Sequence, residues 1–248
     1  MKTALLDQVA SSYFTTQAWD AYTDEAHEVW SILYRRRIDT LRETGARLFL
    51  DGAEAIGLDE SRVPELARVN AALEARTGWN AVPVTGFLPA REFFTCLAHR
   101  RFPTTVSVRP IEKLDYLQEP DIFHDVFGHV PLHADPVFAD FLQKFGAVAA
   151  RARSDEETAW MARLFWFTVE FGLIREGGVT KVYGSGLISS AADAANALGP
   201  ECDRRAFEID AVIAQPFEID RLQDVLFVVD DFDQLFDAVR TMETRIGG

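Results

Sequence analysis

Apolar side chains recur every three or four residues along most of this chain, which is the spacing of amphipathic helices. The first long stretch predicts a helix over residues 21–44, which Gly45 ends. Its apolar stripe consists of Val29, Trp30, Leu33, Ile38 and Leu41. A second helix is predicted to begin at Pro64, which suits the first helical position, and to end before Gly78.

The longest predicted helix lies in the second half of the chain. Ser154 and Glu157 form the capping-box pattern of a helix start, and we expect the helix to run to the glycine pair at 177–178. Before it, Pro136 starts a helix with several phenylalanines on its apolar face. A small helix is expected after residues 189–190, followed by a C-terminal part of mixed structure.

Strands are predicted to be few and short. Their pattern places them at residues 80–85, 104–108 and 179–183. A turn at residues 86–89 leads into a helix that carries Phe93. No repeat, low-complexity tract or linker divides the chain. We therefore expect a mainly α fold with minor short β-strands, built as one single domain over residues 1–248.

Composition narrows the range of partners. The formal net charge is −14, from 39 acidic and 25 basic residues, which argues against a nucleic-acid or anionic-membrane surface. Small molecules are the expected partners. Cys96 and Cys202 lie far apart in sequence and match no disulfide framework, so we expect free thiols in a reducing compartment. The N-terminus has no signal-peptide pattern and no segment reaches the roughly 20 apolar residues of a membrane span, so we expect a cytoplasmic protein.

Two histidines and one glutamate form a candidate metal site: His124, His129 and Glu170. Three protein ligands leave coordination positions open for chemistry. On a regular helix, histidines five residues apart would point about 140° away from each other. We therefore expect the helix to end between them, with Gly128 and Pro131 letting the backbone leave it.

The residues around these three ligands leave open what compensates the charge of Glu170 and what orients the imidazoles. Glu170 falls on the inward face of its helix, where it needs a metal, a proton or an ion pair with Arg163, seven residues earlier. Asp121 and Asp125 are candidates to accept from an imidazole N–H and to fix its tautomer. His133 follows His129 by four residues, but the intervening proline spoils a shared helical face.

The choice of metal rests on the ligand set. Two histidines and one carboxylate with open positions are typical of non-haem Fe(II) oxygenases. Zinc hydrolases with similar ligands usually space their histidines as His-Glu-x-x-His, which this chain lacks. Iron is therefore favoured, and a zinc-dependent hydrolase remains the alternative from another class.

Three separate motifs, which follow one another along the chain, together resemble one known family. Residues 115–132, 166–172 and 183–190 resemble the catalytic domain of the pterin-dependent aromatic amino acid hydroxylases, most closely the short bacterial phenylalanine 4-monooxygenases. The likeness extends from about Tyr22 through the small helix after residues 189–190, and the last fifty residues are less distinctive. It implies the catalytic-domain fold of that family.

The resemblance also implies roles for individual residues. His124, His129 and Glu170 would bind Fe(II). The amino-acid substrate would lie among Arg109, Pro120, Asp121, Trp166, Gly186, Ser189 and Ser190. Arg109 would hold its carboxylate, for which a planar guanidinium is suited. A tetrahydropterin, such as tetrahydrobiopterin, would lie against Gly86, Leu88, Phe93 and Phe165.

The implied reaction converts L-phenylalanine to L-tyrosine with O2 and the tetrahydropterin, and tyrosine or tryptophan hydroxylation remains the runner-up. Vertebrate members have threonine at the place of Leu117, tyrosine at that of Phe165, and Ser-Ser at residues 89–90, so fine pterin contacts are left open. The chain has no room for a preceding regulatory domain and no extended heptad pattern. We therefore expect a monomer.

Overall fold

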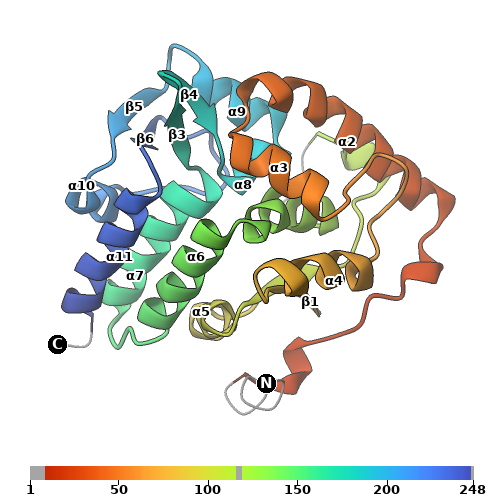
Figure 1. Ribbon diagram of the computed structural model, residues 1–248, viewed down its shortest axis with the longest axis horizontal. Coiled ribbons are helices and arrows are strands. Elements are labelled where there is room, and N and C mark those ends of the chain that lie inside the picture. The colour runs from red at the N-terminus through yellow and green to blue at the C-terminus, as the bar shows by residue number, and fades with distance from the viewer. Residues whose placement is uncertain (1–8, 116–118, 247–248) are drawn as a thin grey trace.

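The computed structural model describes residues 9–115 and 119–246, so Leu117 and its neighbours on either side lie outside the described residues. The larger sheet lies at the upper left of Figure 1 with most helices below it and to its right, and α6, α7 and α11 run side by side at the lower left. The α-helices are α2 (Asp24–Thr44), α3 (Arg47–Ala55), α4 (Leu66–Arg76), α5 (Ala90–Ala98), α6 (Pro136–Ala149), α7 (Asp155–Phe165), α8 (Ser185–Ser189), α9 (Ala191–Leu198), α10 (Ile209–Ala214) and α11 (Asp233–Arg245).

The strands form two sheets. Strands β1 (Asn80–Val84) and β2 (Arg101–Thr105) form a parallel pair. The second sheet has the order β4-β3-β6-β5 and contains β3 (Leu173–Glu176), β4 (Val179–Val182), β5 (Asp203–Ala206) and β6 (Val225–Val229). Short 3-10 helices lie at Ser11–Tyr13, Trp19–Ala21, Ile111–Lys113 and Val130–Ala134.

Capping explains several helix starts. Thr23 accepts a hydrogen bond from the Ala26 amide at the start of α2, and α2 ends at Thr44, before Gly45, as predicted. The capping box of Ser154 and Glu157 is present at the start of α7. Helix α6 begins at Pro136, also as predicted. The expected mainly α fold with short strands is confirmed.

Several predicted boundaries are wrong. The second helix begins at Leu66, not Pro64, because the Gln17 side chain bridges the entry, donating to Pro64 O and accepting from Leu66 N. Strand β2 spans residues 101–105 rather than 104–108; a parallel strand with consecutive buried residues gives no clear alternation. Helix α3 and β3 were not predicted.

The longest predicted helix also ends early. Helical structure stops at Glu170, and the chain continues as β3, which pairs antiparallel with β4. The glycine pair joins these two strands: φ is 58° at Gly177 and 82° at Gly178, a backbone region that suits glycine and two-residue hairpin turns. The pair thus makes a strand turn instead of a helix end.

The core is a nearly continuous cluster of buried side chains from Val29 to Ile246. Aromatic rings concentrate near the predicted metal ligands: Phe123 and Phe127 stack with centroids 4.6 Å apart, and the edge of Trp30 meets Phe123 at 5.5 Å. Cys96 and Cys202 are buried free thiols, as expected. Among the described residues, none of the helices combines the length and apolarity needed to cross a membrane.

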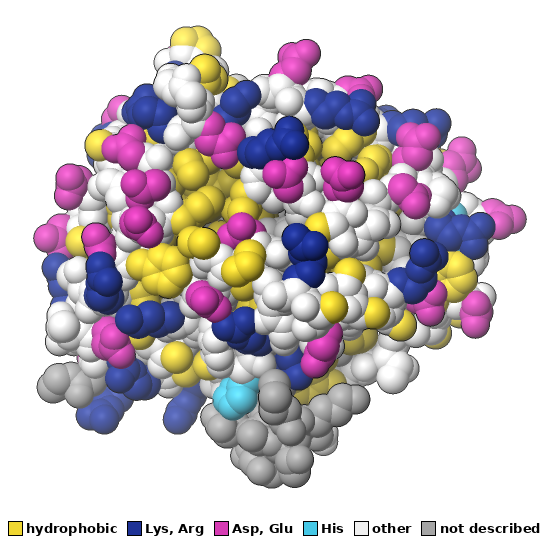
Figure 2. Space-filling model, in the orientation of Figure 1, with side chains coloured by type: hydrophobic (Ala, Val, Ile, Leu, Met, Phe, Trp, Pro, Cys, Tyr) yellow, Lys and Arg dark blue, Asp and Glu magenta, His cyan; other side chains and the backbone are white. Residues whose placement is uncertain are grey.

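The surface carries charges of both signs. On the face in Figure 2, acidic and basic side chains are interspersed, and apolar side chains are visible in patches between them. This mixed face accompanies an overall excess of acidic residues, 39 against 25 basic.

The contact between α5 and α6 yields a test. A Cβ at Gly146 would lie 2.5 Å from Ala98 N and 2.6 Å from Leu97 Cβ. Helix propensity alone would make Gly146→Ala stabilising by about 0.5–1 kcal/mol, whereas overpacking destabilises by about 1–3 kcal/mol. We expect overpacking to dominate and the free energy of unfolding in urea to fall. Ala147→Ser, at an exposed position of the same helix, is the control, and a more stable Gly146→Ala would contradict this packing.

Candidate metal centre

Both histidines of the candidate site lie on one π-helical segment, Phe123–His129. A π-helical turn contains one more residue than an α-helical turn, because each N–H bonds five residues back instead of four. Residues five apart therefore lie almost above one another. The His124 and His129 ring centroids are 5.1 Å apart. The prediction that the helix must end between them is wrong: the helix widens, and the two rings converge.

Gly128 and Pro131 have other roles than the predicted break. A Cβ on Gly128 would lie 2.9 Å from Ser185 O and 3.2 Å from Ser185 Cβ, so glycine permits the close approach of α8. Pro131 lies in the 3-10 helix that follows the π-helical segment. Its carbonyl O lies where a Cβ on Gly52 would be, which shows how closely α3 packs there.

Glu170 approaches the histidines from a second π-helical segment, Trp166–Glu170. Its Oε1 lies 3.0 Å from His129 Nε2, and its Oε2 lies 3.7 Å from His124 Nε2. One ligand atom from each of the three residues lies within 4.8 Å of the others. The alternative ion pair with Arg163 does not form, because Arg163 Nη1 donates to Ile213 O at 2.9 Å.

The electrostatics of Glu170 favour the charged form. Burial acts to raise its pKa, but the nearby His129 and His124 and a hydrogen bond from Ser185 outweigh burial and lower it to about 2. Ser185 Oγ donates to Glu170 Oε2 at 2.7 Å. A partly buried carboxylate beside two imidazoles is a donor set that fits a divalent metal ion.

The tautomer of His124 is set by Ser189. His124 Nδ1 lies 2.9 Å from Ser189 Oγ, and that hydroxyl donates its own proton to Ser185 O at 2.8 Å. Ser189 must therefore accept from Nδ1–H, which leaves the Nε2 lone pair directed at the site. The predicted acceptors are wrong: Asp121 accepts from the His124 backbone amide, and Asp125 accepts from Thr105 N at 2.6 Å.

Arg109 and Asp121 form a two-pronged ion pair beside the histidines. Nε and Nη2 of Arg109 each lie 2.9 Å from a carboxylate oxygen of Asp121, whose side chain is fully buried. Burial acts to raise the pKa of Asp121, but Arg109 and two backbone amides hold it below its usual value. Arg109 Nη1 also donates to Leu114 O. Asp121 thus orients Arg109 and at the same time accepts from the His124 amide.

An open cleft of about 400 Å³ leads to the three ligands, which is a usual size for a small-molecule site. Its lining includes Arg109 and Pro120 from the predicted substrate set and Gly86, Leu88 and Phe93 from the predicted pterin set. It also includes Phe102, which sequence reasoning missed; this ring lies against His129 with centroids 4.6 Å apart. Ser185 was missed too, although it belongs to the quoted motif at residues 183–190.

The remaining predicted residues do not line this cleft. Trp166 is stacked between Phe171 and Phe217, at centroid distances of 4.6 and 4.4 Å. Phe165 contacts Phe93 edge to face at 5.4 Å. Gly186 packs against Phe171, and Ser190 caps α9 by accepting from Asp193 N. Ser189 acts through His124. Their predicted contacts with substrate or pterin stay predictions.

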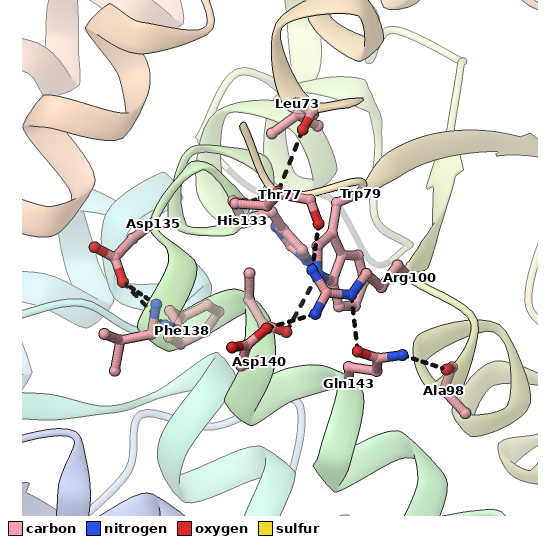
Figure 3. Close-up of polar contacts among 12 residues, drawn as sticks. Leu73, Thr77, Trp79, Ala98, Arg100, His133, Asp135, Phe138, Asp140 and Gln143 are labelled. Atoms are coloured by element: carbon pink, nitrogen blue, oxygen red, sulfur yellow. Dashed lines mark hydrogen bonds and ion pairs between the residues drawn. The ribbon is translucent and has the colours of Figure 1, made fainter. Parts of the chain in front are cut away.

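His133 is a buried neighbour of the site and not a ligand. Its Nδ1 lies 2.9 Å from His129 O, and burial lowers its pKa to about 3, so the ring is neutral. Figure 3 shows the ring beside Trp79 and close to Thr77, whose hydroxyl donates to His133 O. In the same view, Arg100 contacts Asp140 and Gln143 and so ties the start of β2 to α6.

Two imidazoles and one carboxylate at the inner end of an open cleft define a non-haem metal enzyme of the oxygenase type. The chain belongs to the biopterin-dependent aromatic amino acid hydroxylases, with a match over residues 4–247 that includes the less distinctive last fifty residues. It is 44% identical to the phenylalanine-4-hydroxylase of Caulobacter vibrioides, over 88% of this chain and 75% of that protein.

Solved structures of phenylalanine hydroxylases have a fold similar to that of this chain. The Chromobacterium violaceum phenylalanine hydroxylase with bound iron(III) and oxidized cofactor 7,8-dihydrobiopterin superposes with a TM-score of 0.90 at 40% identity, covering 95% of this chain and 87% of that one. Its iron- and phenylalanine-bound structure gives a TM-score of 0.88 at 36% identity, covering 99% and 92%. Membership of this family favours the iron oxygenase over the zinc-dependent hydrolase.

The buried pair predicts a strong effect on stability. Asp121→Asn leaves Arg109 without its partner, and we expect the free energy of unfolding at pH 7 to fall by about 3–5 kcal/mol. Because the folded-state pKa of Asp121 is depressed, its contribution is present above the ordinary carboxyl pKa and is lost as pH falls through the lower folded value. The difference between parent and variant, followed by urea unfolding, should therefore shrink only below about pH 4.

The control for this pair is Asp115→Asn, which removes an exposed partner of Arg36. We expect little change from it at any pH. A parent–variant difference for Asp121→Asn that stayed constant down to pH 2 would contradict the assigned ionisation.

Substitution of two adjacent serines should affect two different properties, metal affinity and stability. Ser189→Ala removes the acceptor of His124 Nδ1–H, and we expect metal affinity to fall by about 10–100-fold with little loss of stability. Ser190→Ala removes the cap of α9 and should lower the free energy of unfolding by about 1 kcal/mol, with metal affinity unchanged. Chelator competition and urea unfolding measure the two quantities, and equal metal affinities in both variants would argue against the assigned tautomer control.

Proposed function

We propose that this chain hydroxylates L-phenylalanine to L-tyrosine with O2 and a tetrahydropterin at a non-haem Fe(II) site. The observation that carries the proposal is the convergence of His124, His129 and Glu170 at a cleft that also contains Arg109. The phenylalanine hydroxylase neighbours with bound iron, dihydrobiopterin and phenylalanine support the same cofactors and substrate for this chain.

The three ligands would hold iron, which together with the pterin supplies activated oxygen when both are bound. The chain's own contribution is to arrange the ligands. Ser185 holds one oxygen of Glu170, and Ser189 fixes the His124 tautomer, so both ligands keep one orientation. Phe102 shields one face of the His129 ring.

The amino acid would be bound through its carboxylate by Arg109. Three of the five guanidinium N–H groups donate to Asp121 and Leu114, and the other two have no acceptor among the residues the structure describes. Asp121 thus fixes the plane of the guanidinium while part of it faces the cleft. Pro120, next in the chain, lines the same cleft and would contact the substrate ring.

The pterin would lie at the other side of the cleft, against Phe93. This ring is supported edge to face by Phe94, Phe102 and Phe165. A ring held in this way can stack on a flat heterocycle without losing much side-chain freedom. Gly86 has open space where a Cβ would be, and Leu88 completes this side.

Some expectations from the sequence remain proposals. We infer a monomer in the cytoplasm whose residues 1–248 act as a single catalytic domain. Hydroxylation of tyrosine or tryptophan remains the alternative within the family, because ring selectivity depends on contacts that only a bound substrate would define.

Product analysis tests the proposed function. The Fe(II)-loaded protein is incubated with tetrahydropterin, O2 and, separately, phenylalanine, tyrosine and tryptophan, and products are identified by mass spectrometry. We expect tyrosine from phenylalanine, with slower or no turnover of the other two. Turnover of phenylalanine without added pterin, or equal rates with Zn(II), would contradict the proposal.

Removal of a ligand should abolish this activity without unfolding the chain. His124→Ala and Glu170→Ala lose a metal ligand each, so bound iron and turnover should both be lost while circular dichroism stays unchanged. His27→Gln on α2, which keeps an acceptor for Val63 N, is the matched control and should retain both.

A further inference from the structure

A buried arginine contacts α8, the helix that packs against the histidine segment, and plays no part in the function described so far. Arg37 belongs to α2, and only 3% of its surface is exposed. It shares the inward face of the helix with Leu33 and Leu41, one turn to either side. Ile38, which the apolar pattern places on that face, is only partly buried. A cation in a position that an aliphatic side chain would fill requires a compensating interaction.

The compensation comes from the end of α8. Arg37 Nε donates to Ile188 O at 2.8 Å, and Nη2 donates to Leu187 O at 2.9 Å. The last four carbonyls of any helix lack partners within the helix, and in a helix of five residues this is most of the backbone. A cation at the C-terminal end also interacts favourably with the helix dipole.

Arg37 remains charged in this place. Burial lowers its pKa to about 10, against an opposing effect of Asp193. Near neutral pH it is therefore a buried cation whose planar fork bonds two successive carbonyls. Lysine, with a single ammonium on a flexible stem, would not reproduce this geometry.

The helix that Arg37 holds carries two groups that orient the metal ligands. Ser185, at the start of α8, donates to Glu170 Oε2, and Ser189, at its end, accepts from His124 Nδ1. A displacement of α8 would therefore move both contacts together. Arg37 itself reaches neither ligand through a hydrogen bond.

A second connection fixes α2 relative to α8. Just after α2 ends, Ala46 N donates to Val182 O at 2.8 Å, and Val182 is the last residue of β4, which leads into α8. Figure 1 shows α2 crossing the upper right of the molecule, with α8 near the centre. The backbone bond sets the position of α2, and the Arg37 side chain then sets that of the far end of α8.

We propose that Arg37 is a positioning residue for the metal site, which acts by clamping the C-terminal end of α8 so that Ser185 and Ser189 hold Glu170 and His124 in ligand geometry. This inference rests on the proposed metal site. It separates Arg37 from the other buried side chains of α2, of which Val29, Leu33 and Leu41 only pack and Trp30 also donates to Asp59 O.

The test uses the full chain with Co(II) as a probe of the metal site. Arg37→Met keeps the length and apolar stem of the side chain and removes the fork. We expect the affinity for Co(II), measured by chelator competition, to fall about tenfold or more, and the Co(II) visible spectrum to change. Arg36→Met, at the neighbouring exposed position that pairs with Asp115, is the matched control and should match the parent in both.

Two further variants separate positioning from packing. Arg37→Lys keeps the charge without the fork, and we expect it to recover only part of the Co(II) affinity. Combined with Ser189→Ala, Arg37→Met should add less than its separate effect, because both changes disturb the same contact with His124. If Arg37→Met fails to fold, Arg37→Lys decides by the same measurements.

The possible outcomes distinguish a positioning role of Arg37 from a packing role. A variant with lowered thermal stability but with parental Co(II) affinity and spectrum would overturn the proposal, and so would additive effects with Ser189→Ala or failure of both Arg37 variants to fold. If the parent itself does not bind Co(II) or hydroxylate phenylalanine, the proposed function fails instead.

Discussion

Burial of a charged carboxylate is the constraint on which the metal site depends. Glu170 loses much of its hydration inside the protein, and the neighbouring imidazoles and a hydrogen-bond donor keep it ionised. His129, His124 and Ser185 are these neighbours, and each comes from a segment whose local geometry brings it within reach. A divalent cation bound between the imidazoles and the carboxylate would meet the same requirement more fully.

The sequence was sufficient wherever a signal is local. The capping box at Ser154, the start of α6 and the three ligands could be predicted, because neighbouring residues or a motif define them. The end of the α7 region could not, because apolar residues beyond Glu170 suit a helix as well as a buried strand. The pairing of β3 with β6, more than fifty residues later, decides between them.

Contacts between distant segments account for the other differences. The acceptor for His124 was sought among nearby aspartates, whereas Ser189 lies 65 residues later. Arg37 was not singled out from the sequence, and its two acceptors lie about 150 residues away. Polar side chains that serve a remote backbone leave no periodic pattern, so apolar spacing alone does not reveal them.

The two π-helical segments make the site depend on the number of residues as much as on their identity. Relative to an α-helix, each segment contains one inserted residue per turn. Loss of a residue between the histidines would leave them four apart on a tighter α-helix, where they would still share a face. One residue added between them would instead place them six apart, about 120° from each other at 100° per residue on a regular helix. An added residue in Trp166–Glu170 would likewise redirect the carboxylate of Glu170. Insertions into these short segments are therefore more damaging than many substitutions within them.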